Sequence, residues 1–214
     1  MAEATRRLTA LATAAAALAA VLAVSGQPSK PATAPADFGA ALPRQTAATT
    51  PPPGTAESRS DTAADVAPPQ RVRIGEVGLD ARVRAVGVTG QGSVTVPGDP
   101  SVAGWYRYGP APGSPRGSAV LVGHVDSETG ALGEFAALYE VRPGARVEVR
   151  RAEAAPVVFR VVSRTTVPKD DLPPSAFRRT GDPVLTLITC APPFEPERGG
   201  YLANLIVTAE PVPG

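Results

Sequence analysis

The chain has 214 residues, a formal net charge of +1 and only 5% aromatic residues. This length fits one domain with extensions, and the near-neutral charge and scarce aromatics argue against a nucleic-acid partner. The single cysteine excludes a disulfide within the chain and any C-x-x-C metal or redox site.

The N-terminal segment, residues 1–26, has the pattern of an export signal. Arg6 and Arg7 precede the uncharged stretch LTALATAAAALAAVLAVSG, and a positive flank before an apolar segment is typical of secretory signals. Ala23 and Ser25 suit a small-x-small cleavage site, whereas an uncleaved segment would anchor the chain in the membrane. We therefore expect an exported protein at the outer face of the cell membrane or in the cell wall, anchored or secreted.

Residues 27–70 are rich in Pro, Ala, Thr and Ser and contain almost no large apolar side chain. Such a segment buries too little surface to offset the loss of chain entropy on folding. We expect a disordered, extended tether that holds the folded part away from the membrane. An O-glycosylated stalk and a plain spacer fit this composition equally well.

Residues 71–214 form the expected folded domain. Alternation in Arg71-Val72-Arg73-Ile74 has the period of a half-buried strand. Similar short runs recur between Gly and Pro residues, a pattern typical of a closed barrel or a sandwich. The runs are RVRIGEVGL, ARVRAVGV, GSVTVPG, SAVLVGHV, ARVEVRR, PVVFRVVS, PVLTLITC and NLIVTAE.

One segment, GALGEFAALYEVRPG, departs from the strand pattern. Its large apolar residues Leu132, Phe135, Leu138 and Tyr139 fall at helical spacing. We expect one or two helical turns here, ended by Pro143-Gly144. The fold class predicted is therefore all-β: a small barrel of about 140 residues, a usual domain size, with one or two short helices.

The only histidine and the only cysteine each close an apolar run: His124 ends SAVLVGH and Cys190 ends LTLITC. The rim of a barrel, where such strands end, is a place where side chains can meet a ligand. A nearby imidazolium favours the reactive thiolate, and the imidazole can pass a proton to a leaving amine. A lone buried Cys and a structural His are the competing interpretations of these two residues.

The stretch VPGDPSVAGWYRYGPAPGSPRGSAVLVGHVDS, residues 96–127, resembles the sortases, most closely the actinobacterial class E and class F members. The shared features are a V-P-x-D-P opening, a G-W-Y, a G-P-x-P-G turn and a strand ending G-H-V-D. The second signature, a strand ending T-L-x-T-C, matches Thr186 to Cys190. The resemblance covers roughly residues 71–211.

The resemblance implies a closed eight-stranded β-barrel outside a Gram-positive cell. Its cysteine would attack a Thr–Gly bond in an LPXTG-like sorting signal, and an amine from the cell-wall precursor or a pilin would resolve the thioacyl-enzyme. Cys190 then matches the nucleophile and His124 the general acid/base. Thr189, Asn204 and Leu172, the last in the loop 166–182 that matches the family's groove-forming connection, become candidate substrate-binding residues. No cofactor is implied.

The third family residue, an arginine in a Y-R-D-N run, is replaced. Here the run reads Tyr201-Leu202-Ala203-Asn204, and leucine donates no hydrogen bond to an oxyanion. Loss of one such donor typically costs ~10²–10³ in kcat. Arg198 could supply the guanidinium, the enzyme could work slowly on backbone donors, or transpeptidation could be lost; an ordinary loop role for Arg198 is a fourth interpretation.

Asp126 lies two residues after His124 and could orient the imidazole or cap a turn. Trp105 and Tyr106 are expected to pack against the barrel. The acidic residues show no spacing typical of a metal site, so we predict no metal.

The leading hypothesis is an exported cysteine transpeptidase acting on proteins with a sorting signal. The alternative is a weak or inactive sortase-fold protein that binds a surface peptide, with Leu202 as the distinguishing feature. A hydrolase that releases the acyl group to water shares the same residues.

Overall fold

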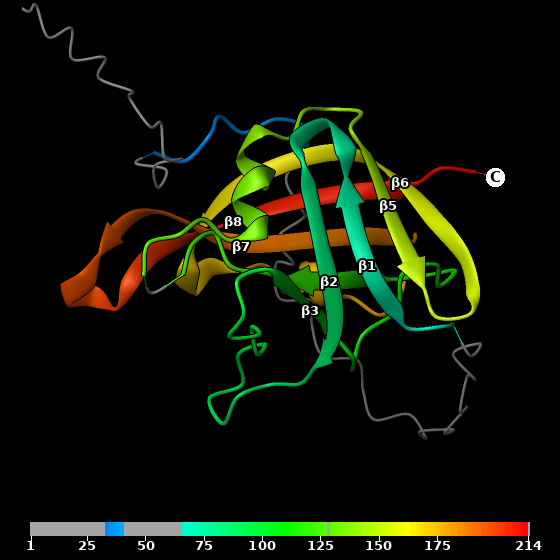
Figure 1. The fold of residues 1–214 in the computed structure, drawn as a ribbon, viewed down its shortest axis with the longest axis horizontal. Helices are drawn as coiled ribbons and strands as arrows, with labels where there is room; N and C mark the ends of the chain where they lie inside the picture. The colour runs from blue at the N-terminus through cyan, green and yellow to red at the C-terminus, as the bar shows by residue number, and fades with distance from the viewer. Residues whose placement is uncertain (1–32, 41–65, 128, 214) are drawn as a thin grey trace, which may run out of the picture.

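The computed structural model describes residues 33–40, 66–127 and 129–213. In this part of the chain the backbone forms eight strands, shown in Figure 1. They are β1 (Pro69–Ile74), β2 (Leu79–Val86), β3 (Val102–Tyr106), β4 (Ser118–Val122), β5 (Arg146–Arg151), β6 (Ala154–Pro168), β7 (Val184–Glu195) and β8 (Gly200–Pro211). Short 3₁₀ helices connect several of them: η1 (Gly75–Val77), η2 (Glu134–Glu140), η3 (Lys169–Asp171), η4 (Pro174–Phe177) and η5 (Pro196–Arg198).

The strands close into one barrel in the order β1-β2-β3-β4-β7-β8-β6-β5. The pairs β2–β3 and β4–β7 are parallel, and the other neighbours are antiparallel. A parallel pair requires a long crossover, and β5, β6 and the turns η3 and η4 occupy the crossover from β4 to β7. The predicted all-β closed barrel is confirmed.

Side-chain alternation fills the barrel interior as the sequence predicted. In β1, Val72 and Ile74 are fully buried, while Arg73 between them points outward. The helical segment is also confirmed, because η2 buries Phe135, Leu138 and Tyr139. The run GSVTVPG is the exception to the expected strands: Val94 forms only an isolated bridge with Val88. Pro97 offers no N–H to a ladder, and glycines flank the run.

β7 is buried on both faces, which explains its continuous apolar sequence. Its inner face joins the barrel core, and Ile188 on its outer face packs with Val120 and Val122 of β4. The connection between β6 and β7 covers this outer cluster with Leu172 and Phe177.

Residues 33–40, drawn in blue in Figure 1, differ from the tether that the sequence predicted for 27–70. Phe38 exchanges two backbone hydrogen bonds with Arg164 of β6, each 2.9 Å long. The Arg164 guanidinium lies over the Phe38 ring and donates to the Ala36 carbonyl oxygen at 2.7 Å. β5 pairs with β6 only as far as Arg160, so this segment covers a strand edge that would otherwise be exposed.

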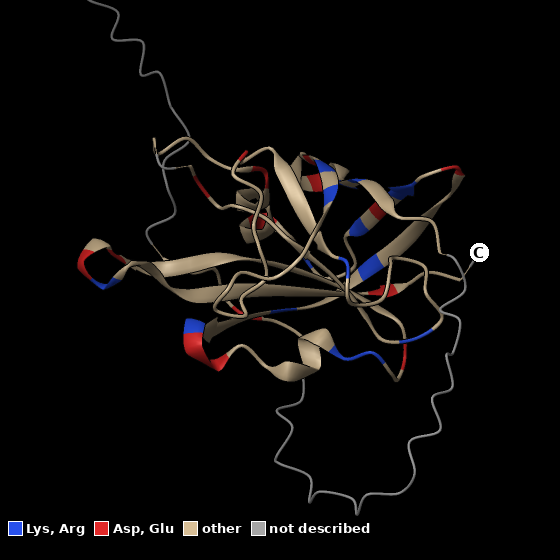
Figure 2. Ribbon diagram, turned by 90° about the horizontal axis from the view of Figure 1, so that it is seen from below, with Lys and Arg blue, Asp and Glu red and all other residues tan. Residues whose placement is uncertain are grey.

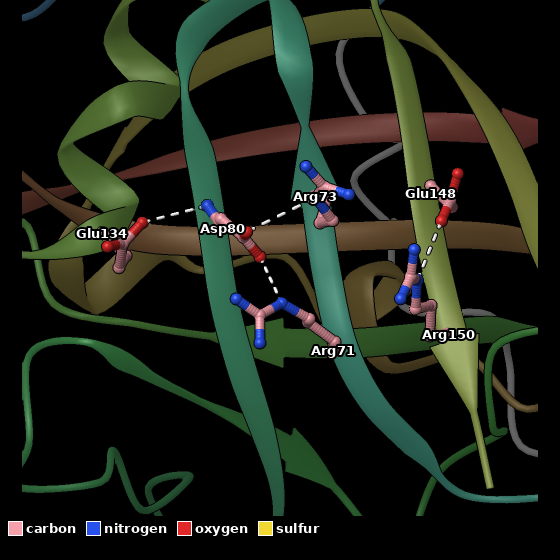
Figure 3. A network of polar contacts seen from close by, with 6 residues as sticks. All are labelled: Arg71, Arg73, Asp80, Glu134, Glu148 and Arg150. Atoms are coloured by element: carbon pink, nitrogen blue, oxygen red, sulfur yellow. Dashed lines mark hydrogen bonds and ion pairs between the residues drawn. The ribbon is translucent and has the colours of Figure 1, made fainter.

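The outer face of β1, β2 and β5 carries paired charges (Figure 3). Asp80 on β2 forms ion pairs with Arg71 and Arg73 of β1. The Glu134 carboxylate of η2 accepts a hydrogen bond from the Asp80 backbone N–H at 3.0 Å, which fixes the start of η2 against β2.

Among the helices in the described ranges, none is long and apolar enough to cross a membrane. The segment 1–26, predicted as a signal or anchor, lies outside the described residues.

Candidate active site

A cleft of about 910 Å³ contains both reactive residues predicted from the sequence. It lies where β7 and β8 reach the end of the barrel, beside the loop that follows β4. Its lining consists of Gly98, His124, Asp126, Ser127, Thr129, Gly130, Lys169, Cys190, Phe194, Pro196, Gly199, Gly200 and Tyr201.

The parallel pairing of β4 with β7 brings His124 beside Cys190. Val122 pairs with Ile188, and the Gly123 N–H continues the ladder by donating to the Ile188 carbonyl oxygen at 3.1 Å. His124 follows Val122 by two residues, as Cys190 follows Ile188, and both line the same cleft. Neighbouring strands lie roughly 4.8 Å apart, so their 66-residue separation in sequence is no obstacle to a shared site.

The histidine loop is held by close packing around Gly123. A Cβ at Gly123 would lie 2.6 Å from the Phe135 ring, so only glycine lets η2 approach this closely. The Thr189 hydroxyl donates to the Gly123 carbonyl oxygen at 2.8 Å, which ties β7 to the loop. Thr189 is only 3% exposed, and the substrate contact that the sequence suggested for it stays a prediction.

The His124 ring is oriented by the VPGD segment. Its Nε2 lies 2.8 Å from the Pro97 carbonyl oxygen. A carbonyl oxygen only accepts, so Nε2 carries the proton and donates it in this bond. Nδ1 is therefore the ring nitrogen left for proton transfer.

Cys190 is a half-buried free thiol on β7. Burial raises the pKa of this thiol, Lys169 acts to lower that pKa, and the Asp126 carboxylate acts to raise it. A buried thiol of this kind is mainly protonated at neutral pH, so it needs a cation or a base to react. The Tyr139 hydroxyl donates to the Cys190 carbonyl oxygen at 2.9 Å and fixes the backbone of the cysteine from η2.

Asp126 accepts a hydrogen bond from the Tyr201 hydroxyl at 2.9 Å and also forms an isolated bridge with Leu132. Burial and this carboxylate both raise the pKa of the Tyr201 phenol, which therefore stays neutral. The hydrogen bond between Tyr201 and Asp126 links β8 to the loop after β4 across the cleft.

The remaining predicted site residues lie around this cleft rather than in its lining. Asn204 is buried on β8, directly opposite Cys190. Leu172 packs on the outer cluster of β4 and β7. Leu202 is half-buried on β8.

Arg198 lies in η5, at the tip of the β7–β8 hairpin that projects beyond the barrel in Figure 2. Its side chain is 66% exposed and pairs with Glu195 at 3.2 Å. The cleft-lining residues do not include Arg198.

Sequence reasoning missed three residues of the site: Lys169, Tyr139 and Tyr201. Tyr201 was used only to align the Y-R-D-N run, and Lys169 lay unremarked in the loop assigned to the groove. In the described part of the chain, no three His, Cys, Asp or Glu side chains gather as metal ligands would.

The barrel and its cleft define a cysteine–histidine site on an eight-stranded sheet, and comparison with known proteins gives the family. The family model described as "Sortase domain" matches residues 72–212. The chain belongs to the sortase family. Membership implies a sortase-type transpeptidase that acts on sorting signals and is exported to the cell surface.

Solved structures of other sortases share the fold. Sortase C2 of Group B Streptococcus pilus island 1 is 23% identical, with a TM-score of 0.51 over 67% of this chain and 73% of that one. Sortase C1 from Streptococcus agalactiae is 20% identical, with a TM-score of 0.52 over 68% and 67%. Sortase C-1 from Actinomyces oris is 22% identical, with a TM-score of 0.51 over 67% and 73%. A search of curated proteins finds no match.

Proposed function

We propose that this chain is a cysteine transpeptidase that cleaves an LPXTG-like sorting signal through a thioacyl-enzyme on Cys190. The observation that carries the proposal is that His124, just after β4, and Cys190, on the neighbouring strand β7, line one cleft. Tyr139, Thr189 and Pro97 hold the two residues from three different segments. Such support is what a preorganised reactive pair requires.

The first half-reaction uses both side chains. The Cys190 thiolate forms a bond from Sγ to the threonine carbonyl carbon of the signal, and the C=O electron pair moves to oxygen. When the tetrahedral intermediate collapses, the C–N bond to glycine breaks. The leaving nitrogen takes a proton from the His124 imidazolium, and a thioester remains.

In the second half-reaction an amine attacks the thioester carbon and loses a proton to the neutral imidazole. The C–S bond breaks, and the thiolate is regenerated. The acceptor is an amine of a cell-wall precursor or of a pilin. A cleft open to solvent on one side admits this second substrate after the glycine fragment has left.

The finer assignments follow from the sequence signatures. We place the chain nearest to the class E and class F sortases, with residues 71–214 as the catalytic domain of an exported protein. Residues 1–26 then act as the signal or membrane anchor and 27–70 as the linker. Thr189, Asn204 and Leu172 remain candidate substrate contacts, and Asp126 a candidate support for His124.

A second function is favoured by Leu202. With leucine in place of the usual arginine, the chain could bind a sorting-signal peptide while turning it over slowly or not at all. A hydrolase, in which water takes the place of the amine, would use the same Cys190 and His124.

The test mixes the purified chain with a fluorescent LPXTG or LAXTG peptide and a glycine or diaminopimelate amine. We expect cleavage, a thioacyl adduct on Cys190 by mass spectrometry, and loss of both in Cys190→Ala. Ligation product separates transfer from hydrolysis. If the wild-type chain binds the peptide but forms no adduct, the alternative function of a peptide-binding protein is favoured.

A further inference from the structure

The cleft contains a thiol and a carboxylate but little positive charge. Of the described residues that line it, Lys169 is the only lysine or arginine. The other titratable groups in the lining are His124, Asp126, Cys190 and Tyr201. Lys169 is an exposed residue at the edge of this lining.

Strand register places Lys169 next to the position where the family arginine is missing. β8 lies between β6 and β7, and Asn204 pairs with Val167 on one side and with Cys190 on the other. Pro168 pairs with Ala203. β6 ends at Pro168, and Lys169 follows it as the first residue of η3, just as Leu202 adjoins Ala203 on β8. The turn η3, which begins at Lys169, also packs against β8.

We propose that Lys169 is the cationic catalytic residue of this site, supplying from the end of β6 the positive charge that an arginine at position 202 would supply from β8. The inference rests on the proposed transpeptidase function. A lysine on its flexible four-carbon stem is a compact charge with three donors, and from this place it reaches the same part of the cleft.

The ammonium group acts at two stages. Before the reaction it stabilises the Cys190 thiolate, against the opposing effects of burial and Asp126. This is the direction in which Lys169 acts on the Cys190 thiol pKa. During acylation it donates to the oxyanion that forms on the threonine carbonyl oxygen, a role that a preorganised donor fills in acyl transfer.

Arg198 is less suited to this role by geometry. It sits on the hairpin tip, and Glu195 already neutralises it. We therefore expect a larger loss of turnover in Lys169→Gln than in Arg198→Gln. The reverse order would return the role to Arg198 and overturn the proposal.

The first experiment measures the rate of Cys190 alkylation by iodoacetamide against pH in the full purified chain. The chain has one cysteine, so the labelled fraction reports a single thiol. In Lys169→Gln we expect the thiol pKa to rise, so that alkylation at neutral pH slows by about tenfold. Lys169→Arg keeps the charge and keeps the wild-type profile.

The matched control is Arg150→Gln, which removes one positive charge from β5, two strands from β8. Its alkylation profile should superimpose on that of the wild type, and thermal unfolding verifies that each variant is folded. A Lys169→Gln profile that also superimposes on the wild type overturns the proposal.

The second experiment separates this inference from the proposed function. In the peptide assay we expect Lys169→Gln to lower kcat by ~10²-fold, the usual scale for one lost oxyanion donor. The double variant Lys169→Gln/Leu202→Arg should have a kcat at least tenfold higher than that of Lys169→Gln alone. If the wild-type chain forms no acyl-enzyme but the alkylation profile still shifts, the transpeptidase proposal fails while Lys169 keeps its effect on the thiol. If the double variant stays as slow as Lys169→Gln, position 169 does not replace position 202.

Discussion

Two charged regions of this barrel serve different purposes. On the outer face of β1, β2 and β5, carboxylates pair with neighbouring arginines on a solvent-exposed sheet (Figure 3). In the cleft, a half-buried thiol, an imidazole and a carboxylate share one lysine. Solvent screens the first set, so its charges contribute little individually. In the second set the thiol is half-buried, so the charges beside it change its reactivity.

Substitutions in the cleft should therefore affect activity, whereas substitutions in the paired network should affect only stability. The largest effect should come from His124→Ala, which removes the proton donor for the leaving amine. We expect kcat for signal cleavage to fall by ~10²–10⁴, the range for lost general acid–base catalysis. Steady-state kinetics with the fluorescent peptide measures this loss.

Arg73→Gln, in the network, is the counterpart of His124→Ala. It should leave kcat within about twofold, because removing one exposed ion pair has only a small effect. Equal losses in the two variants would remove the distinction between the regions.

A smaller effect, on stability, should come from Gly123→Ala. The added Cβ meets the Phe135 ring at 2.6 Å, and overpacking of this kind typically costs ~1–3 kcal/mol. The displaced η2 should also disturb His124, so that kcat falls together with the free energy of unfolding. Chemical denaturation followed by fluorescence measures the free energy of unfolding.

Gly75→Ala provides the matched control on the network side, because its Cβ would meet no atom within 4 Å. We expect a change in unfolding free energy below about 0.5 kcal/mol, as is usual for surface substitutions. A Gly123→Ala protein as stable and as active as Gly75→Ala would show that the close approach of η2 does not position the histidine.

Much of the fold was predictable because it depends on local patterns. Alternation in β1 and the helical spacing of Phe135 and Leu138 are set by neighbours in sequence. Cys190 and His124 were identified because each ends an apolar run within a distinctive motif.

The rest depends on contacts between distant segments. Residues 33–40 have the composition of a linker, but Phe38 and Asp37 bind along the uncovered edge of β6. The Asp37 carboxylate accepts a hydrogen bond from the Thr166 N–H at 2.9 Å. Lys169 matters only because it lines the cleft from the turn after β6, and the pairing of Pro168 with Ala203 brings that turn beside β8. No local pattern in the chain indicates either contact.

The smallest expected effect concerns Asp80 in the network. A hydrogen bond from Arg71 lowers the pKa of the Asp80 carboxyl below its ordinary value. A group with a lowered folded-state pKa contributes stability above its unfolded pKa and loses that stability as the pH falls through the folded value. The wild type should therefore be slightly more stable than Asp80→Asn above the ordinary Asp pKa of ~3.9, and this difference should disappear as the pH falls through the lowered folded-state pKa.

Thermal unfolding of both proteins from pH 2 to pH 7 tests this difference, and added salt should reduce it because the pair is exposed to solvent. The alkylation profile of Cys190 should be the same in the two proteins over the titrable range. A shift of that profile in Asp80→Asn would mean that the network reaches the cleft through Glu134 and η2, and the two regions would then act as one electrostatic unit.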